Sequence, residues 1–227
     1  MNNILKHLLP SSQSRIAIVA NGEFPSQIAV IEHLTRSDLI IACDGAINQL
    51  AANNILADYV IGDGDSSTPD KIQLFAKNPY IKIPDQNSND LSKAVNFLEQ
   101  IFGCEHEVII YAATGLREDH ALANIALLLQ YAQRFKNIHL LSDHGIFTVC
   151  HSGTQTLTSS AGQQISFFSL EQAQNNSLNC AELKWPLINL RLEYLNSGTL
   201  NQATGEQLTI SCNHPTLIFR AFETKSN

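Results

Sequence analysis

The sequence predicts a two-domain protein in which an α/β domain precedes a small all-β domain, and three observations support this fold class. Short apolar runs alternate with helix-like patterns up to about residue 145, which is typical of a parallel sheet covered by helices. Beyond that point, short β-like runs are separated by turns rich in Gly and Asn. In addition, every aspartate of the chain lies at or before Asp143.

The N-terminal part begins with a strand-like run at residues 15–22, RIAIVANG, which is rich in Ile and Val and stops at Asn-Gly. Further strands are predicted at residues 38–45, 57–64, 80–83, 107–115 and 137–143. Helix-like patterns are found at residues 25–36, 46–54, 69–77, 91–102 and 118–135. The fourth of these is the clearest, because its apolar residues recur at i, i+3, i+4 and i+7 and Asn89 or Asp90 can cap its start. We therefore expect a Rossmann-like α/β domain with a parallel sheet at residues 1–145.

The C-terminal part carries β-like runs at residues 146–150, 154–159, 163–170, 183–187, 206–212 and 216–222. Residues 154–158, TQTLT, alternate in the manner of a half-buried strand, and the turns between the runs are short and polar. We therefore expect an antiparallel β-sandwich domain at residues 146–227.

Composition excludes several classes of protein. The 227 residues are 44% hydrophobic and 15% charged, so the chain can bury a sizeable core. A net charge of −7 argues against a nucleic-acid partner, which selects basic surfaces. We expect no membrane association, because the apolar runs fall far short of the ~20 residues that cross a bilayer and no signal-peptide pattern is present. The five cysteines form no CxxC pair, which favours free thiols in a cytoplasmic protein.

Two aspartates, Asp63 and Asp65, end the predicted strand in the stretch YVIGDGDSST. On an extended segment, residues i and i+2 point the same way, so the two carboxylates would be crowded on one face. A hard divalent cation such as Mg²⁺ relieves that repulsion and can bridge to phosphate oxygens. Asp44 ends the preceding strand and joins the same cluster if the two strands are neighbours. The alternatives are an exposed turn at Asp63 and Asp65 and a turn or helix cap at Asp44.

Other polar residues follow on a helix and after a strand. Asp90 and Lys93 are i, i+3 neighbours on one helical face. They form either a surface ion pair, or part of a site in which the carboxylate faces a metal and the ammonium faces phosphate. Arg117 is suited to bidentate contact with phosphate. Asp119 could cap the next helix or face a cation, and His120 is either structural or part of a site.

Trp185, the only tryptophan, lies in LKWPL, which we interpret as a β segment with Pro186 at its end or on an edge. Its ring is either part of a core or a flat platform for an aromatic or cationic ligand. No GxxxxGK[ST] or GxGxxG loop is present, so a nucleotide would be bound without either of them.

Five sequence blocks, taken in order, resemble the thiamine pyrophosphokinase family. That family typically reads DGGA, GDxDS, TDxxKA, GATGGRxDH and LKYPL or LKWPL. The corresponding stretches here are CDGA at 43–46, GDGDS at 62–66, NDLSKA at 89–94, ATGLREDH at 113–120 and LKWPL at 183–187.

The resemblance implies a homodimer of two-domain subunits, with thiamine bound between the subunits. It implies transfer of the pyrophosphoryl group of ATP to the thiamine hydroxyl, which leaves AMP. Mg²⁺ would be held by Asp44, Asp63, Asp65 and Asp90. Lys93 and Arg117 would contact phosphate, and Asp119 would face a metal or a hydroxyl. Substrate contacts are expected from Asp44, Thr114, His120, Trp185, Thr199 and Asn201, with Trp185 stacked on thiamine.

The chain departs from the family pattern at four positions. Gly64 replaces a usually bulky residue, Asn89 a common Thr, Leu116 the second Gly of TGG, and Leu200 the usual Ser before Asn201. Two other functions therefore stay open: a pyrophosphokinase for another heterocyclic alcohol, such as a hydroxymethylpterin, and a nucleotide-binding protein without turnover. The LKWPL block argues against the pterin enzyme.

Overall fold

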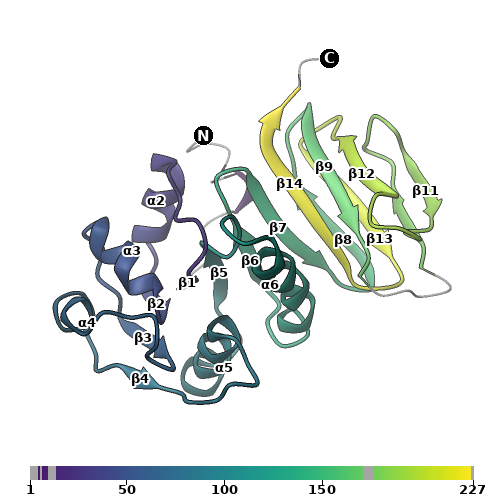
Figure 1. Cartoon of the computed structure of the whole chain (residues 1–227). Coiled ribbons are helices and arrows are strands. Elements are labelled where there is room, and N and C mark those ends of the chain that lie inside the picture. Colours follow the sequence, from purple (N-terminus) through teal and green to yellow (C-terminus); the bar gives the residue numbers. More distant parts are fainter. Residues whose placement is uncertain (1–4, 6, 10–13, 171–175, 226–227) are drawn as a thin grey trace. The chain divides into compact units, whose positions relative to one another are not determined.

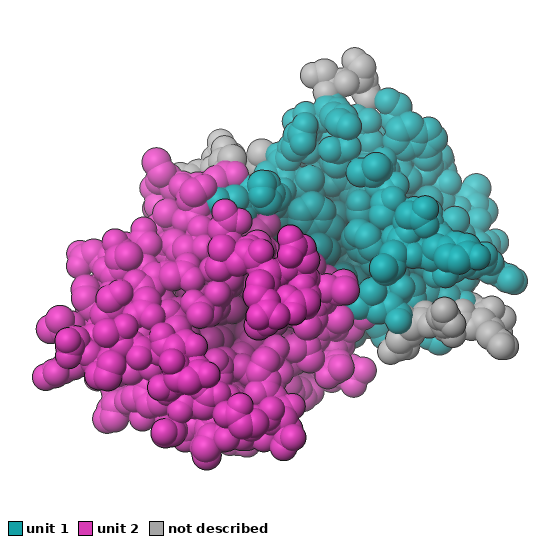
Figure 2. All heavy atoms as spheres, in the orientation of Figure 1, with its two compact units in different colours: residues 1–11, 143–227 teal, residues 12–142 magenta. Residues whose placement is uncertain are grey.

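The computed structural model describes residues 5, 7–9, 14–170 and 176–225 of the chain. These residues form two compact units, which Figure 2 colours separately. Unit 2 is Ser12–Ser142, and unit 1 is Asp143–Asn227 together with the N-terminal residues up to Ser11. The strands make a large mixed sheet and a separate four-stranded antiparallel sheet, so the fold is of the mixed α/β class. The sequence predicted the α/β part and the all-β part, but it described the first sheet as parallel.

Unit 2 contains six parallel strands, labelled in Figure 1. Their bounds are β1 Arg15–Val19, β2 Leu39–Cys43, β3 Tyr59–Gly62, β4 Ile81–Lys82, β5 Glu107–Tyr111 and β6 Ile138–Leu141. The spatial order is β4-β3-β2-β1-β5-β6, and each neighbouring pair is parallel. Apolar residues dominate β1, β2 and β5 because both faces of these strands are buried. The Rossmann-like description of this part stays a prediction.

Five helices accompany these strands: α2 Ile28–Thr35, α3 Ala46–Ala52, α4 Pro69–Phe75, α5 Asp90–Phe102 and α6 Glu118–Tyr131. Helix α5 packs against β1, β2 and β3 and buries its apolar stripe, as its spacing predicted. Asn89 is its N-cap, and the Asn89 side chain accepts a hydrogen bond from the Ser92 amide at 2.9 Å. Helices α2 and α6 are shorter than predicted, because α2 begins only after Gln27 and the chain beyond Tyr131 turns out of the α-helix.

Unit 1 is built from two layers of antiparallel strands, which are the antiparallel part of the large mixed sheet and the separate four-stranded sheet. Its strands are β7 Gly145–Cys150, β8 Gly153–Thr158, β9 Gln163–Phe168, β10 Leu178–Cys180, β11 Leu187–Leu190, β12 Gly198–Gln202, β13 Gln207–Cys212 and β14 Thr216–Thr224. The order is β12-β9-β14-β7 in one sheet and β11-β10-β13-β8 in the other. One hydrophobic cluster takes residues from both, including Ile165, Phe167 and Ile218 from the first and Leu208 and Ile210 from the second. Two layers therefore share one core, which is how sandwiches are stabilised.

A buried arginine of unit 1 is bonded to one of the described N-terminal residues. Leu5, Leu8 and Leu9 are buried, and the Arg220 guanidinium donates to the Leu8 carbonyl, the Thr158 carbonyl and the Thr148 hydroxyl. Burial lowers the pKa of Arg220 to about 10.

The interpretation of LKWPL as a β segment is wrong for its central residues. Leu183 makes an isolated bridge with Ala203, and β11 begins only at Leu187. Pro186 has no amide hydrogen to donate, and the backbone of Trp185 is bonded to a side chain instead of a strand.

Among the described helices, none has the length and apolarity needed to cross a membrane.

A half-buried histidine makes the stability of unit 2 depend on pH. The His33 Nδ1 atom on α2 lies 2.6 Å from the Tyr111 hydroxyl on β5. Burial, followed by the charges of Arg15 and Arg36, lowers the pKa of His33 to about 4 from 6.5. Between these values the unfolded chain binds a proton that the folded chain does not. The free energy of unfolding should therefore fall by up to about 3 kcal/mol from this group as pH falls from 7 to 4.

Urea unfolding at a series of pH values would measure this contribution. In His33→Asn the decline between pH 7 and 4 should be reduced by that amount, whereas the exposed His120→Asn should leave it unchanged. Equal pH dependence in His33→Asn and the wild type would contradict the assignment.

Candidate functional site

The carboxyl ends of β2 and β3 bring the acidic residues together. These strands pair in parallel, with Cys43 opposite Ile61, so Asp44 and Asp63 follow at the same edge. Carboxylate oxygens of Asp44, Asp63 and Asp65 lie within 4.8 Å of one another. Asp44 was predicted to join the cluster if the two strands were neighbours, and the strand order shows that they are.

The way in which Asp63 and Asp65 converge differs from the extended segment assumed from the sequence. Gly64 has a φ of 88°, which bends the chain into a turn. The Asp65 amide donates to Asp63 Oδ1 at 3.3 Å, and the Ser66 hydroxyl donates to Asp65 Oδ1 at 2.6 Å. The two carboxylates are therefore placed by a side-chain-bonded turn, and glycine at 64 suits its left-handed backbone.

Asp44 is fully buried behind this turn. Its Oδ2 accepts a hydrogen bond from the Ser66 amide, and its Oδ1 accepts one from the Tyr80 hydroxyl, both at 2.8 Å. Gly62 leaves the space that Asp44 needs, because a Cβ at residue 62 would lie 2.5 Å from the Asp44 Cβ.

Lys93 carries a positive charge into the cluster from α5. Its side chain is 2% exposed, and its Nζ donates to Asp90 Oδ1 at 2.9 Å and to Asp63 Oδ2 at 3.2 Å. The bond from Lys93 lowers the pKa of Asp63. Burial raises the pKa of Asp90, and Lys93 acts against that rise. Burial disfavours the charged form of Lys93, but its bonds to both carboxylates outweigh this effect and raise its pKa.

A cleft of about 460 Å³ lies over this cluster within unit 2. The predicted residues that line it are Asp63, Asp65, Asp90, Lys93, Arg117 and His120. Asp44 lies beneath it, and neither Thr114 nor Asp119 is part of its lining. Asp119 is exposed and pairs with Arg117 through two bonds of 2.6 and 3.1 Å, which lower the pKa of Asp119 to about 2.

Two further residues at the cluster were not found from the sequence. Gln86 donates from Nε2 to Asp63 Oδ2 at 3.2 Å, and Tyr80 is the donor to Asp44. The polar stretch before α5 hinted at the first of them. No pattern marked Tyr80, because it stood only as the first residue of a weak strand.

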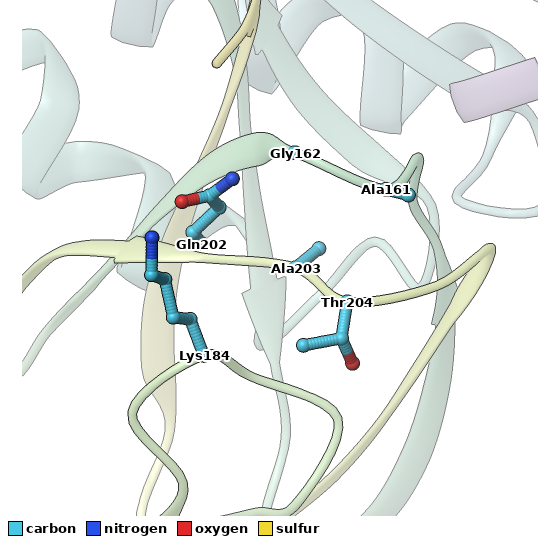
Figure 3. Close-up of a pocket in the computed structure, with 6 residues that line it drawn as sticks. All are labelled: Ala161, Gly162, Lys184, Gln202, Ala203 and Thr204. Carbon is cyan, nitrogen blue, oxygen red and sulfur yellow. The ribbon is translucent and has the colours of Figure 1, made fainter. Parts of the chain in front are cut away.

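Three predicted residues lie in unit 1: Trp185, Thr199 and Asn201. Trp185 is 57% exposed, and the Lys184 Nζ lies 5.4 Å from the centroid of its ring. The Thr199 hydroxyl donates to the Asn196 carbonyl. None of these three residues lines the hollow of about 340 Å³ in unit 1. Their sequence neighbours Lys184 and Gln202 do line it, and Figure 3 shows these two side chains extending the same way at its wall.

Asn201 is buried and uses its amide group on Trp185. Its Oδ1 accepts from the Trp185 amide at 3.3 Å and from the Gln202 amide at 2.8 Å, and its Nδ2 donates to the Trp185 carbonyl at 2.7 Å. The structure thus places Asn201 as a support of the Trp185 backbone.

The acidic cluster has the right chemistry for a hard divalent cation. Carboxylate oxygens are the ligands that Mg²⁺ prefers, and three residues offer them within 4.8 Å. A parallel sheet whose strand ends carry such a cluster, with a buried lysine and an arginine at one cleft, is typical of enzymes that act on phosphate-bearing substrates.

Comparison with protein families identifies the class more closely. The family description "Thiamin pyrophosphokinase, catalytic domain" matches residues 31–141, and "Thiamin pyrophosphokinase, substrate-binding domain" matches residues 145–219. The chain belongs to the thiamin pyrophosphokinase family, whose members transfer a pyrophosphoryl group from ATP to thiamine. This confirms the resemblance drawn from the five sequence blocks. A search among curated proteins found no match to the sequence.

Solved structures share the fold. The thiamin pyrophosphokinase from Candida albicans has a TM-score of 0.80 at 16% identity and covers 97% of this chain and 92% of its own. The Bacillus subtilis enzyme has a TM-score of 0.76 at 22% identity, covering 92% and 99%. The yeast enzyme has a TM-score of 0.77 at 16% identity, covering 96% and 89%.

Leu116 should lower the stability of the folded chain. Its φ is 55°, its side chain is 71% exposed, and a left-handed backbone costs a residue with a Cβ about 1–2 kcal/mol. Leu116→Gly relieves this strain, and the greater freedom of glycine in the unfolded chain offsets part of the gain. The free energy of unfolding should rise by roughly 0.5–1 kcal/mol in urea titrations.

Leu74→Gly is the matched control, because Leu74 is 72% exposed but lies in helix α4. Glycine there should lower the free energy of unfolding by about 1 kcal/mol. A loss of stability in both variants would show that Leu116 is not strained.

The support of Trp185 by Asn201 predicts a spectroscopic change. Because Trp185 is the only tryptophan, its fluorescence reports on this segment alone. Asn201→Ala should lower the fluorescence anisotropy, increase quenching by acrylamide, and lower the free energy of unfolding by about 1–3 kcal/mol. The exposed Asn196→Ala should change none of these. An unaltered anisotropy in Asn201→Ala would contradict the support.

Proposed function

We propose that this chain is a Mg²⁺-dependent thiamine diphosphokinase that uses the acidic cluster of unit 2 to hold the triphosphate of ATP. The observation that carries this proposal is the set of three carboxylates within 4.8 Å, joined to a buried Lys93, at the ends of two parallel strands. A domain of residues 1–145 provides this site, and a β-sandwich domain of residues 146–227 provides the thiamine side. The parallel part is Rossmann-like in our proposal.

Asp63 and Asp65, with Asp44 and Asp90, would hold Mg²⁺, which when bound neutralises charge on the triphosphate. Lys93 and Arg117 contact phosphate oxygens and place the β-phosphorus. The hydroxyl oxygen of thiamine bonds to that phosphorus, and the bond to the oxygen shared with the α-phosphorus breaks. AMP leaves with the shared oxygen, and the hydroxyl proton is released. Positioning and charge neutralisation do most of the work in such transfers.

Thiamine recognition is assigned to both units. Trp185 offers an exposed indole face that already attracts the Lys184 ammonium, and a thiazolium cation suits the same face. Thr199 and Asn201 belong to this side, Asn201 by holding Trp185. Thr114, His120 and Asp119 belong to the ATP side. We propose that thiamine binds between two subunits of a homodimer.

We place the enzyme in the cytoplasm. All five cysteines are free, and Cys43, Cys150, Cys180 and Cys212 are buried, which suits a reducing compartment.

The experiment that tests the function is AMP release from Mg-ATP with and without thiamine, together with the mass of the product. AMP that depends on thiamine, and a product heavier by one pyrophosphoryl group, are expected. Asp63→Asn should lower kcat at least about 100-fold, since it removes charge from the centre of the cluster. The exposed Asp70→Asn on α4 is the control and should retain activity.

Two results would overturn the proposal in different ways. AMP release with a pterin alcohol but not with thiamine would identify a pyrophosphokinase of another substrate. Tight binding of Mg-ATP without AMP release would identify a nucleotide-binding protein. In that case the only effect of Asp63→Asn would be weaker binding of Mg-ATP.

A further inference from the structure

We propose that Tyr80 is a positioning residue of the phosphate site, and that it acts through Asp44 on the turn carrying Asp63 and Asp65. This inference rests on the proposed function, because it concerns the same acidic cluster. It assigns a role to a side chain that does not line the cleft and that no sequence motif includes.

Tyr80 reaches the cluster because of strand pairing. It directly precedes β4, and β4 pairs with β3 so that Ile81 lies opposite Ile61. The Ile83 amide also bonds to the Gly62 carbonyl at 2.7 Å, which fixes this chain segment beside the turn. The Tyr80 hydroxyl then donates to Asp44 Oδ1 at 2.8 Å.

The bond from Tyr80 completes the set of donors around Asp44. One carboxylate oxygen of Asp44 is bound by Tyr80 and the other by the Ser66 amide. Because Asp44 is fully buried, water cannot replace a lost donor without rearrangement. A carboxylate can only accept a hydrogen bond, so the Tyr80 hydroxyl is the donor in this pair.

The tyrosine ring also lies against the glycines of the turn. A Cβ at Gly62 would lie 3.1 Å from the Tyr80 hydroxyl oxygen, and a Cβ at Gly64 would lie 3.6 Å from it. The Tyr80 hydroxyl can therefore orient the Asp44 carboxylate and also restrict the movement of the backbone at Gly62 and Gly64. The Asp44 carboxylate accepts a hydrogen bond from the Ser66 amide and so holds Ser66 in place. The Ser66 hydroxyl in turn donates a hydrogen bond to Asp65.

Loss of the hydroxyl should loosen the acidic turn without removing a ligand. Groups that orient metal ligands from behind typically change metal affinity by about 10–100-fold when they are mutated. We expect Tyr80→Phe to bind divalent metal about tenfold more weakly, with a smaller effect on the fold.

The test is a titration with Mn²⁺, followed by electron paramagnetic resonance, in the presence of α,β-methylene ATP, which cannot be cleaved at the reacting bond. The wild type, Tyr80→Phe and Tyr59→Phe are compared, each after its folding has been verified by circular dichroism. Tyr59 is a matched control because its ring packs on the aromatic rings of Phe97 and Phe102. The expected result is a dissociation constant about tenfold higher for Tyr80→Phe alone.

A second variant keeps the test decisive if Tyr80→Phe folds poorly. Substitution of Tyr80 by 4-aminophenylalanine retains a donor at the same place, and it should restore metal affinity to within about twofold of the wild type. An unchanged affinity in Tyr80→Phe, or no recovery with the amino analogue, overturns the inference while the proposed function stands. A wild type that binds no Mn²⁺ overturns both.

Discussion

The structure of the site depends on the placement of one buried ammonium among carboxylates. Burying Lys93 alone would cost several kcal/mol, and crowding Asp63 beside Asp44 and Asp65 is unfavourable without a cation. The carboxylates offset the cost of burying Lys93, and Lys93 offsets the repulsion between the carboxylates, since it bonds to both Asp63 and Asp90. Four carboxylates still face one ammonium, so the cluster retains an excess of negative charge that a divalent cation can neutralise.

This pairing requires helix α5 to be placed in one position on the sheet. Lys93 reaches Asp63 only if α5 begins at Asp90, and the Asn89 cap fixes that start. The apolar stripe of α5 then holds the helix against β1, β2 and β3, which carry the acidic residues at their ends. A shift of the helix by one residue would turn Lys93 away from the sheet and would bring polar side chains of α5 into its buried stripe.

The sequence predicted the elements that depend on periodicity and the cluster that depends on strand order. Continuous apolar runs marked β1, β2, β3 and β5, and parallel pairing brought Asp44 to Asp63. The sequence did not predict contacts made by single side chains across long separations. Tyr80 lies 36 residues from Asp44, and Asn201 lies 16 residues from Trp185, so neither pairing leaves a local pattern. An extended segment was assumed at Gly64, where the turn named as the alternative is found, because a positive φ cannot be derived from alternation.

In both units, a buried side chain holds an exposed residue in place through hydrogen bonds. An exposed side chain has little packing to hold it, as the 57% exposed Trp185 shows. Its backbone is held instead by the buried Asn201, whose oxygen and nitrogen are both bonded. In unit 2, the exposed Asp65 is held through Ser66 by the buried Asp44, whose two oxygens are both bonded. A buried side chain with its hydrogen bonds satisfied has one orientation, and the residue bonded to it inherits that orientation. Such supports explain how solvent-facing groups can be preorganised on loops, where neither helix nor strand fixes them.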